Sequence, residues 1–156
     1  MASTAKTLTF VIPAYNMESY LDRCVNSLLS ASDISDLEVL IVDDGSKDGT
    51  LEYARKLERT NPGAVRAIHQ ENKGHGGAVN TGIAAATGMY VKVVDADDWV
   101  DPQAIDTVLA TLRAQHGTDE PIDMLVTNYV YDKVAKRHKT VVNFRRVMEA
   151  GRVLGW

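Results

Sequence analysis

Three short runs of apolar, mostly β-branched residues stop at a proline or an aspartate, and segments with helical periodicity separate them. The runs are Leu8–Ile12, Leu37–Val42 and Tyr90–Val94. Continuous apolar runs of this length predict strands that are buried on both faces, as in a parallel sheet covered by helices. A fourth strand is predicted at Val65–His69 and a fifth at Met124–Tyr131.

The segments between the strands carry apolar residues at the spacing of an amphipathic helix. The three apolar stripes comprise Leu21, Cys24, Val25, Leu28 and Leu29, then Leu51, Ala54 and Leu57, then Ile105, Val108, Leu109 and Leu112. We expect Asp48 to cap the second helix and Asp101 the third, with Pro102 in its first turn. Strands that alternate with helices imply right-handed crossovers. The sequence therefore predicts one α/β domain built on a mostly parallel sheet.

The chain has 156 residues, a formal net charge of −4 and one cysteine, Cys24. A single cysteine excludes an internal disulfide framework and fits a reducing compartment. The mild acidity, without long runs of like charge, argues against nucleic acid or a lipid surface as a partner bound by bulk charge. No segment approaches the roughly 20 apolar residues of a membrane span. We expect a cytoplasmic protein, which regions outside this sequence attach at most peripherally to the inner face of the membrane.

Polar residues, mostly acidic, follow the carboxyl ends of three predicted strands. These strand ends are Pro13–Asn16, Asp43–Ser46 and Asp95–Asp98. In open α/β sheets, ligands bind beyond the carboxyl ends of the strands. The sequence therefore predicts a functional site at this edge of the sheet.

The glycine-rich segment Gly74–Gly77 does not match the common nucleotide-binding motifs. Val79 occupies the position of the third glycine of the dinucleotide fingerprint, and the segment follows a later strand. A phosphate-binding loop with Gly-Lys followed by Ser or Thr does not occur in the chain. Two interpretations stay open. The glycines bring a helix N-terminus close to an anion, with Lys73 beside it, or they form a tight turn before a helix that packs through small residues.

The carboxylates of Asp95 and Asp97 are one residue apart at the end of a predicted strand. Such a pair can hold a hard divalent cation when a diphosphate completes the coordination shell, and the alternative is a turn or a cap. We interpret Asp98 and Asp101 as turn and cap residues. For Asp43–Ser46 the two alternatives are a hydrogen-bond acceptor for a base or ribose and an acidic turn that leads into a helix.

Five segments carry these features in a fixed order: Val11–Asn16, Leu40–Ser46, Asn72–Gly74, Gly77–Gly82 and Val94–Trp99. Together they closely resemble the family 2 glycosyltransferases of the GT-A fold, over about two thirds of the chain. The resemblance implies a Rossmann-like GT-A domain that is truncated. Its donor-binding half would cover about residues 8–115, and an acceptor half would begin incompletely at about residues 124–156.

The resemblance also implies an activity. A sugar would pass from a nucleotide-diphosphate donor, usually UDP-linked, to an acceptor with inversion, for example in the synthesis of cell-surface polysaccharide or glycolipid. The acceptor, whether saccharide, lipid-linked or protein, is not specified. The alternative is a non-catalytic nucleotide-sugar-binding fragment. A sugar nucleotidyltransferase is less favoured, because Pro13–Asn16 stands where that class has a glycine-rich and basic loop.

The resemblance assigns roles residue by residue. The residues that match donor-nucleotide contacts are Pro13, Ala14, Tyr15, Glu18, Asp44, Lys73 and Asp95. Asp44 matches the carboxylate that binds the base. Asp95 and Asp97 match the motif that holds Mg²⁺ or Mn²⁺, with Asp97 the more direct ligand. The catalytic base is expected beyond Trp156, and Asp132 is the one tolerable candidate within the chain.

Three further residues lie near these motifs. His75 and Trp99 have two interpretations each, and Cys24 has only a structural one. His75 is either a contact to the donor sugar or diphosphate or a plain loop residue. Trp99 either flanks the sugar or packs beside the acidic loop. Cys24 belongs to an apolar helix stripe, and we expect it in the core.

Overall fold

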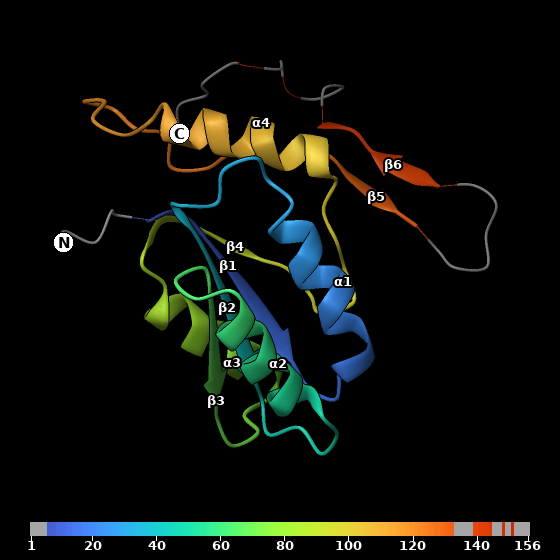
Figure 1. Ribbon diagram of the computed structural model, residues 1–156. Helices are drawn as coiled ribbons and strands as arrows, with labels where there is room; N and C mark the ends of the chain where they lie inside the picture. The colour runs from blue at the N-terminus through green and yellow to red at the C-terminus, as the bar shows by residue number, and fades with distance from the viewer. Residues whose placement is uncertain (1–5, 133–138, 145–147, 149–150, 152–156) are drawn as a thin grey trace. The chain divides into compact units, whose positions relative to one another are not determined.

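The computed structural model describes residues 6–132, 139–144, 148 and 151, and the chain divides after Ala114 into two compact units (Figure 1). The first unit comprises β1 (Lys6–Ala14), α1 (Glu18–Leu28), β2 (Leu37–Asp43), α2 (Thr50–Thr60), β3 (Val65–His69), α3 (Gly74–Ala85), β4 (Gly88–Val93) and α4 (Pro102–Arg113). The second unit contains β5 (Tyr129–Tyr131) and β6 (Thr140–Val142).

The first unit is built on a four-stranded sheet in the order β3-β2-β1-β4, and every neighbouring pair is parallel. β1 is central. It pairs with β2 on one side, where Ala14 lies opposite Asp43, and with β4 on the other, where Val11 lies opposite Val93. The four strands predicted for this part of the chain are confirmed, and β3 has the predicted bounds. The α/β class and the parallel sheet are confirmed with them.

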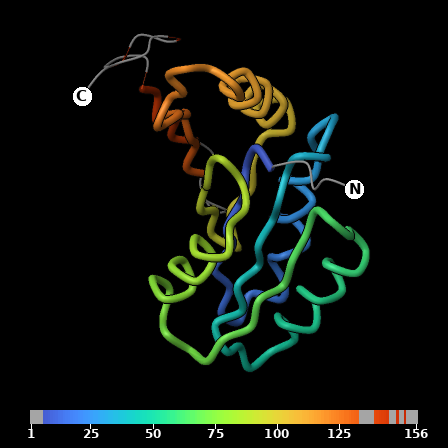
Figure 2. The backbone as a smooth tube through the Cα atoms, turned by 90° about the vertical axis from the view of Figure 1, so that its left-hand side faces the viewer, coloured from blue at the N-terminus to red at the C-terminus, as the bar shows by residue number. Residues whose placement is uncertain are grey.

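Helices cover both faces of this sheet. Figure 2 shows α3 on one side of the strands and α2 on the other. α3 packs on a cluster of buried side chains that includes Val11 and Leu40. Its backbone comes so close to β1 that a Cβ at Gly82 would overlap Val11 Cγ1. The glycine at position 82 is therefore required by the close packing of α3 on the central strand.

The predicted caps are confirmed for one helix and displaced for another. Asp101 Oδ1 accepts the backbone N–H groups of Gln103 at 2.8 Å and Ala104 at 3.1 Å, and α4 begins at Pro102 as expected. The prediction for α2 is wrong by one residue, because Gly49 is the N-cap. Asp48 still accepts the Thr50 N–H at 3.0 Å, since its side chain reaches over the start of the helix.

The glycine-rich segment is helical. α3 begins at Gly74, whose φ of +75° is the left-handed conformation that glycine adopts without strain. The interpretation of residues 74–77 as a turn that precedes the helix is therefore wrong, because these residues form its first turn. Tertiary packing on β1 overrides the low helix propensity of glycine here.

The second unit contains a short antiparallel hairpin within its described residues. Val130 pairs with Val141 at its centre, Tyr129 lies opposite Val142, and Tyr131 lies opposite Thr140. The predicted strand at 124–131 is thus correct only for its last three residues. Residues 133–138, 145–147, 149–150 and 152–156, which belong to the expected start of an acceptor half, lie outside the described part.

Helices α1, α2, α3 and α4 are each 11 or 12 residues long. In the part of the chain that the structure describes, none of them combines the length and the apolar character that crossing a bilayer demands.

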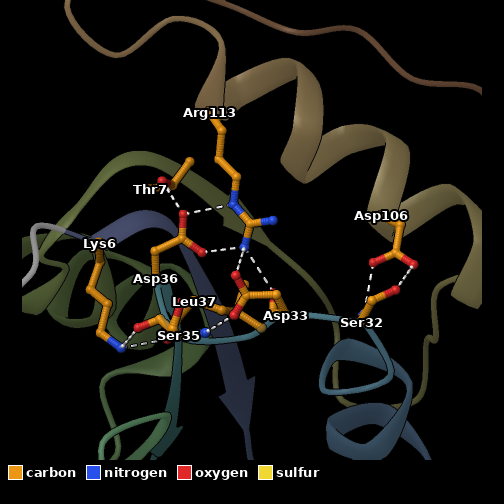
Figure 3. Close-up of polar contacts among 9 residues, drawn as sticks. All are labelled: Lys6, Thr7, Ser32, Asp33, Ser35, Asp36, Leu37, Asp106 and Arg113. Atoms are coloured by element: carbon orange, nitrogen blue, oxygen red, sulfur yellow. Dashed lines mark hydrogen bonds and ion pairs between the residues drawn. The ribbon is translucent and has the colours of Figure 1, made fainter.

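A polar cluster joins α4 to the loop before β2 at the amino edge of the sheet (Figure 3). Arg113 Nε donates to Asp36 Oδ2 at 2.9 Å, and Thr7 Oγ1 donates to the same oxygen. The hydrogen bond from Arg113 lowers the pKa of Asp36 to about 2, against the opposing effect of burial and with further help from Thr7. Lys6 Nζ donates to the carbonyls of Ser35, Leu37 and Gly63.

Candidate functional site

Asp44 lies at the carboxyl end of β2, and its side chain is almost completely buried, with the residue 2% exposed. Its backbone N–H donates to the Ala14 carbonyl at 2.9 Å, which ties the ends of β1 and β2 together. Its Oδ1 accepts the Gln70 side-chain amide at 2.6 Å and the Lys73 backbone N–H at 2.8 Å. Asp44 is therefore fixed by groups from three neighbouring segments.

The charge of Asp44 is stabilised by these donors. Burial acts to raise the pKa of the carboxyl. The backbone N–H of Lys73, the Gln70 amide, the N–H of Gly74 and the Lys73 charge together outweigh burial and hold the pKa below its usual range. An anionic, fixed carboxylate at a strand end can accept a hydrogen bond from an N–H or O–H group of a ligand.

The loops after β1 and β2 are joined by side chain to backbone hydrogen bonds. Asn16 adopts a positive φ of 55°; its N–H donates to Ser46 Oγ at 3.0 Å, and its Oδ1 accepts the Lys47 N–H at 2.8 Å. The residues before it differ in exposure. Pro13 and Ala14 are buried within β1, whereas Tyr15 is 45% exposed. Of this predicted group, Tyr15 is the residue whose side chain is open to a ligand.

Glu18 has a structural contact. Its Oε2 accepts the Gly49 N–H at 3.0 Å, which links the start of α1 to the start of α2. The Glu18 N–H in turn lies 3.4 Å from Asp48 Oδ2. A donor contact from Glu18 stays a prediction.

The loop after β4 concentrates negative charge. Asp95 and Asp97 are exposed, and Asp97 has no hydrogen bond or ion pair within the described ranges. The neighbouring Asp98 donates its N–H to the Asp95 carbonyl at 2.9 Å. Partial burial, followed by the charges of Asp97 and Asp95, raises the pKa of the Asp98 carboxyl. A cation would relieve this mutual repulsion.

The carboxylates of Asp95 and Asp97 fit a divalent cation that takes the rest of its ligands from a substrate. Both are exposed hard oxygen donors on one loop. Within the described residues, no group of three His, Cys, Asp or Glu side chains is placed to hold a metal by itself. Mg²⁺ commonly binds through one or two carboxylates together with phosphates and water. The donor set therefore suits a phosphate-bound cation better than an all-protein site.

Trp99 and Cys24 lie near the acidic loop after β4, and a contact between Trp99 and the sugar stays a prediction. The Arg23 guanidinium lies over the Trp99 ring, 3.2 Å from its centroid, so the indole has a packing partner beside the acidic loop. Cys24 is fully buried, as expected, and its Sγ lies 3.7 Å from the Asp95 carbonyl. Burial, with smaller contributions from Asp98, Asp97 and Asp95, raises the pKa of its thiol to about 12. The thiol is therefore not a nucleophile at neutral pH.

The sequence-based prediction did not include Gln70, and it considered His75 as a residue of a glycine-rich loop. Gln70 directly follows β3, and the strand-end rule applied to the other strands would have indicated it. His75 lies in the first turn of α3, and its Nε2 is 2.9 Å from Asp95 Oδ1. In the second unit, Asp132 Oδ2 forms an ion pair with Lys139 at 2.8 Å.

A family model described as Glycosyl transferase family 2 matches residues 9–144. The chain belongs to glycosyl transferase family 2. The family and the GT-A-type fold expected from the sequence are thereby confirmed.

Members and structures similar to this family 2 chain are considerably longer. A chondroitin synthase from Escherichia coli is 42% identical over 106 residues, which are 68% of this chain and 15% of that protein. The structure of Staphylococcus aureus TarS 1-349 with UDP-GlcNAc has a TM-score of 0.63 at 28% identity, covering 70% of this chain and 32% of that one. The mannosyltransferase PcManGT from Pyrobaculum calidifontis, in complex with GDP-Man and Mn²⁺, has a TM-score of 0.61 at 28% identity, covering 70% and 32%. The chain spans about a third or less of the length of its curated relatives.

Proposed function

We propose that this family 2 chain is the donor-binding part of an inverting glycosyltransferase that uses a nucleotide-diphosphate sugar, UDP-linked, and a divalent metal. The observation that carries the proposal is the pairing of two kinds of carboxylate on one sheet edge. Asp44 is buried, anionic and held by three donors, whereas Asp95 and Asp97 are exposed and close in sequence. The Asp44 carboxylate suits an uncharged hydrogen-bond donor, and the carboxylates of Asp95 and Asp97 suit a cation.

The base of the donor is assigned to Asp44. Its carboxylate would accept the ring N–H of uracil, with Tyr15 exposed beside the end of β1 and Lys73 at the start of α3. A charged acceptor gives a stronger hydrogen bond than a neutral one. The similarity to a structure that contains UDP-GlcNAc favours a UDP donor, although the PcManGT complex contains GDP-Man.

Asp95 and Asp97 are assigned to Mg²⁺ or Mn²⁺. When bound, such an ion neutralises the negative charge that develops on the departing diphosphate. The residues of this chain contribute the two carboxylates and the fixed loop that carries them, since the Asp95 carbonyl accepts the Asp98 N–H. The Mn²⁺ in the similar PcManGT complex supports this choice of ion.

A second candidate function is donor binding without turnover. An inverting transfer needs a general base for the acceptor hydroxyl. The carboxylate of Asp132, the candidate within the chain, is engaged by Lys139 at 2.8 Å. This ion pair favours donor binding without transfer of the sugar.

Titration calorimetry with UDP, in Mn²⁺ and in chelator, tests the proposal. We expect Asp44→Ala to weaken UDP binding under both conditions, because it removes the base contact. We expect Asp97→Ala to weaken it about tenfold in Mn²⁺ and not in chelator. Glu52→Ala, which removes an exposed carboxylate from α2, serves as the control. Unchanged affinity in both site variants contradicts the proposed function, and an assay of UDP-sugar hydrolysis separates the enzyme from the binding fragment.

A further inference from the structure

His75 and Asp95 belong to different elements and are joined by one hydrogen bond. His75 lies in the first turn of α3 and Asp95 in the loop after β4, 20 positions later in the sequence. His75 Nε2 lies 2.9 Å from Asp95 Oδ1, and since a carboxylate accepts, the imidazole donates. The side chains are 65% and 57% exposed, so packing fixes neither of them.

The backbone of His75 is held in place from the nucleotide side of the site. The Lys73 N–H donates to Asp44 Oδ1 at 2.8 Å, which fixes the residue just before α3. Gly74 follows with a φ of +75°, and its N–H donates to Asn72 Oδ1 at 3.2 Å. The Cα and Cβ atoms of His75 therefore have a defined position, although the imidazole is exposed.

The backbone of Asp95 is also fixed, but its carboxylate has few partners. The Asp95 carbonyl accepts the Asp98 N–H at 2.9 Å and lies 3.7 Å from Cys24 Sγ. In the part of the chain that the structure describes, His75 is the hydrogen-bond partner of Asp95 Oδ1, and Oδ2 has none. The contact with His75 therefore selects one orientation of the carboxylate and leaves an oxygen open.

We propose that His75 is a positioning residue that holds the Asp95 carboxylate ready for a divalent cation shared with Asp97. This inference rests on the proposed function. An exposed carboxylate that rotates freely loses conformational freedom when it binds an ion, and a hydrogen bond that already favours one orientation removes part of that loss in advance. Partners that orient a metal ligand typically contribute about 10–100-fold to metal affinity. Because this pair is exposed to solvent, the low end of that range applies.

The test measures metal binding itself rather than turnover. Free Mn²⁺ is quantified by electron paramagnetic resonance in the presence of saturating UDP, and UDP affinity is measured separately in chelator. The variants are His75→Ala, which removes the donor, and His75→Gln, whose amide can still donate to Asp95. Ile83→Ala removes an exposed side chain from the same helix and is the matched control.

We expect His75→Ala to weaken Mn²⁺ binding about tenfold, His75→Gln to recover most of it, and neither to change UDP affinity in chelator. Wild-type affinity for Mn²⁺ in His75→Ala overturns the inference alone. Equal losses in both variants also overturn it, because the imidazole would then act as a ligand rather than as a donor to Asp95. No Mn²⁺ binding by the wild-type protein with UDP overturns the proposed function and this inference with it.

Discussion

The Lys73 backbone N–H donates to the Asp44 carboxylate over 2.8 Å, which joins the start of α3 to the end of β2. The same carboxylate oxygen accepts the Gln70 amide, and Thr81 from within α3 donates to the carbonyl oxygen of that amide. The contacts form a continuous chain from the helix to the carboxylate. The position of Asp44 therefore depends on Gln70 and, through it, on Thr81 as well as on Lys73.

Gln70→Leu should disturb this arrangement without altering Asp44 itself. The variant leaves a buried carboxylate with one donor fewer, which costs about 1–3 kcal/mol in the free energy of unfolding. UDP affinity should fall as well, because Asp44 is less well oriented. Urea denaturation and calorimetry check the two effects. Thr81→Val removes only the hydrogen bond from Thr81 to Gln70 and should cost less stability. A loss of stability as large as that of Gln70→Leu would contradict the greater importance of the hydrogen bond from Gln70 to Asp44.

Two substitutions of Asn16 should separate the contribution of its backbone conformation to stability from the contribution of its side-chain hydrogen bond. At its φ of 55°, alanine is strained and also removes the acceptor of the Lys47 N–H, so Asn16→Ala should lower stability by about 1–2 kcal/mol. Asn16→Gly loses the same acceptor but adopts this φ freely. Chemical denaturation should therefore rank glycine above alanine. The reverse order would show that the backbone conformation is not what selects asparagine.

Two glycines of α3 should respond in opposite directions to alanine. Gly82→Ala forces a methyl group against Val11 and should destabilise the protein by about 1–3 kcal/mol, the usual effect of overpacking. A Cβ at Gly76 meets nothing within 4 Å, so Gly76→Ala should raise stability by about 0.5–1 kcal/mol through higher helix propensity. Urea midpoints measure both. Equal effects would mean that α3 does not pack on β1 as described.

Asp36 should make the free energy of unfolding depend on pH in the acidic range. Its pKa is about 2 in the folded protein against an ordinary value of 3.8, so its contribution is complete above about pH 4 and is lost as the pH falls toward 2. The shift corresponds to about 2 kcal/mol. Asp36→Asn should therefore be less stable than the wild type at about pH 6, and the two unfolding curves should converge near pH 2. A constant gap between the curves would contradict the role of the Arg113 contact.

The sequence predicted the parts of the fold that rest on local patterns. The apolar run at Val65–His69 has the same bounds as β3, because such runs have few alternatives in an α/β chain. The start of α4 followed from Asp101 and Pro102, whose capping geometry is local. Helix α3 begins earlier than expected, since local propensity opposes glycine. The contact that stabilises it joins Gly82 to Val11, which is distant in the chain and leaves no local signal.

The candidate site was predictable in its strand-end residues and not in their mutual contacts. Asp44 and Asp95 follow apolar strands, which is a visible signal. The hydrogen bond between His75 and Asp95 joins two elements whose spacing depends on the pairing of β1 with β4. Glu18 matched a family position, yet its side chain reaches Gly49, a contact that depends on the packing of α1 beside α2.

The central place of β1 has a consequence for how the protein is made. β1 pairs with β2 early in the sequence and with β4 only from Gly88 onward. The groups that donate to Asp44 lie at or before Gly74, whereas Asp95 and Asp97 follow β4. A ribosome that adds about 5–20 residues per second therefore releases Asp44, the carboxylate that we propose binds the base, before Asp95 and Asp97, which we propose hold the metal. In the nascent chain Asp44 therefore appears first. Asp95 and Asp97 join the same edge of the sheet only when the edge strand β4 pairs with β1.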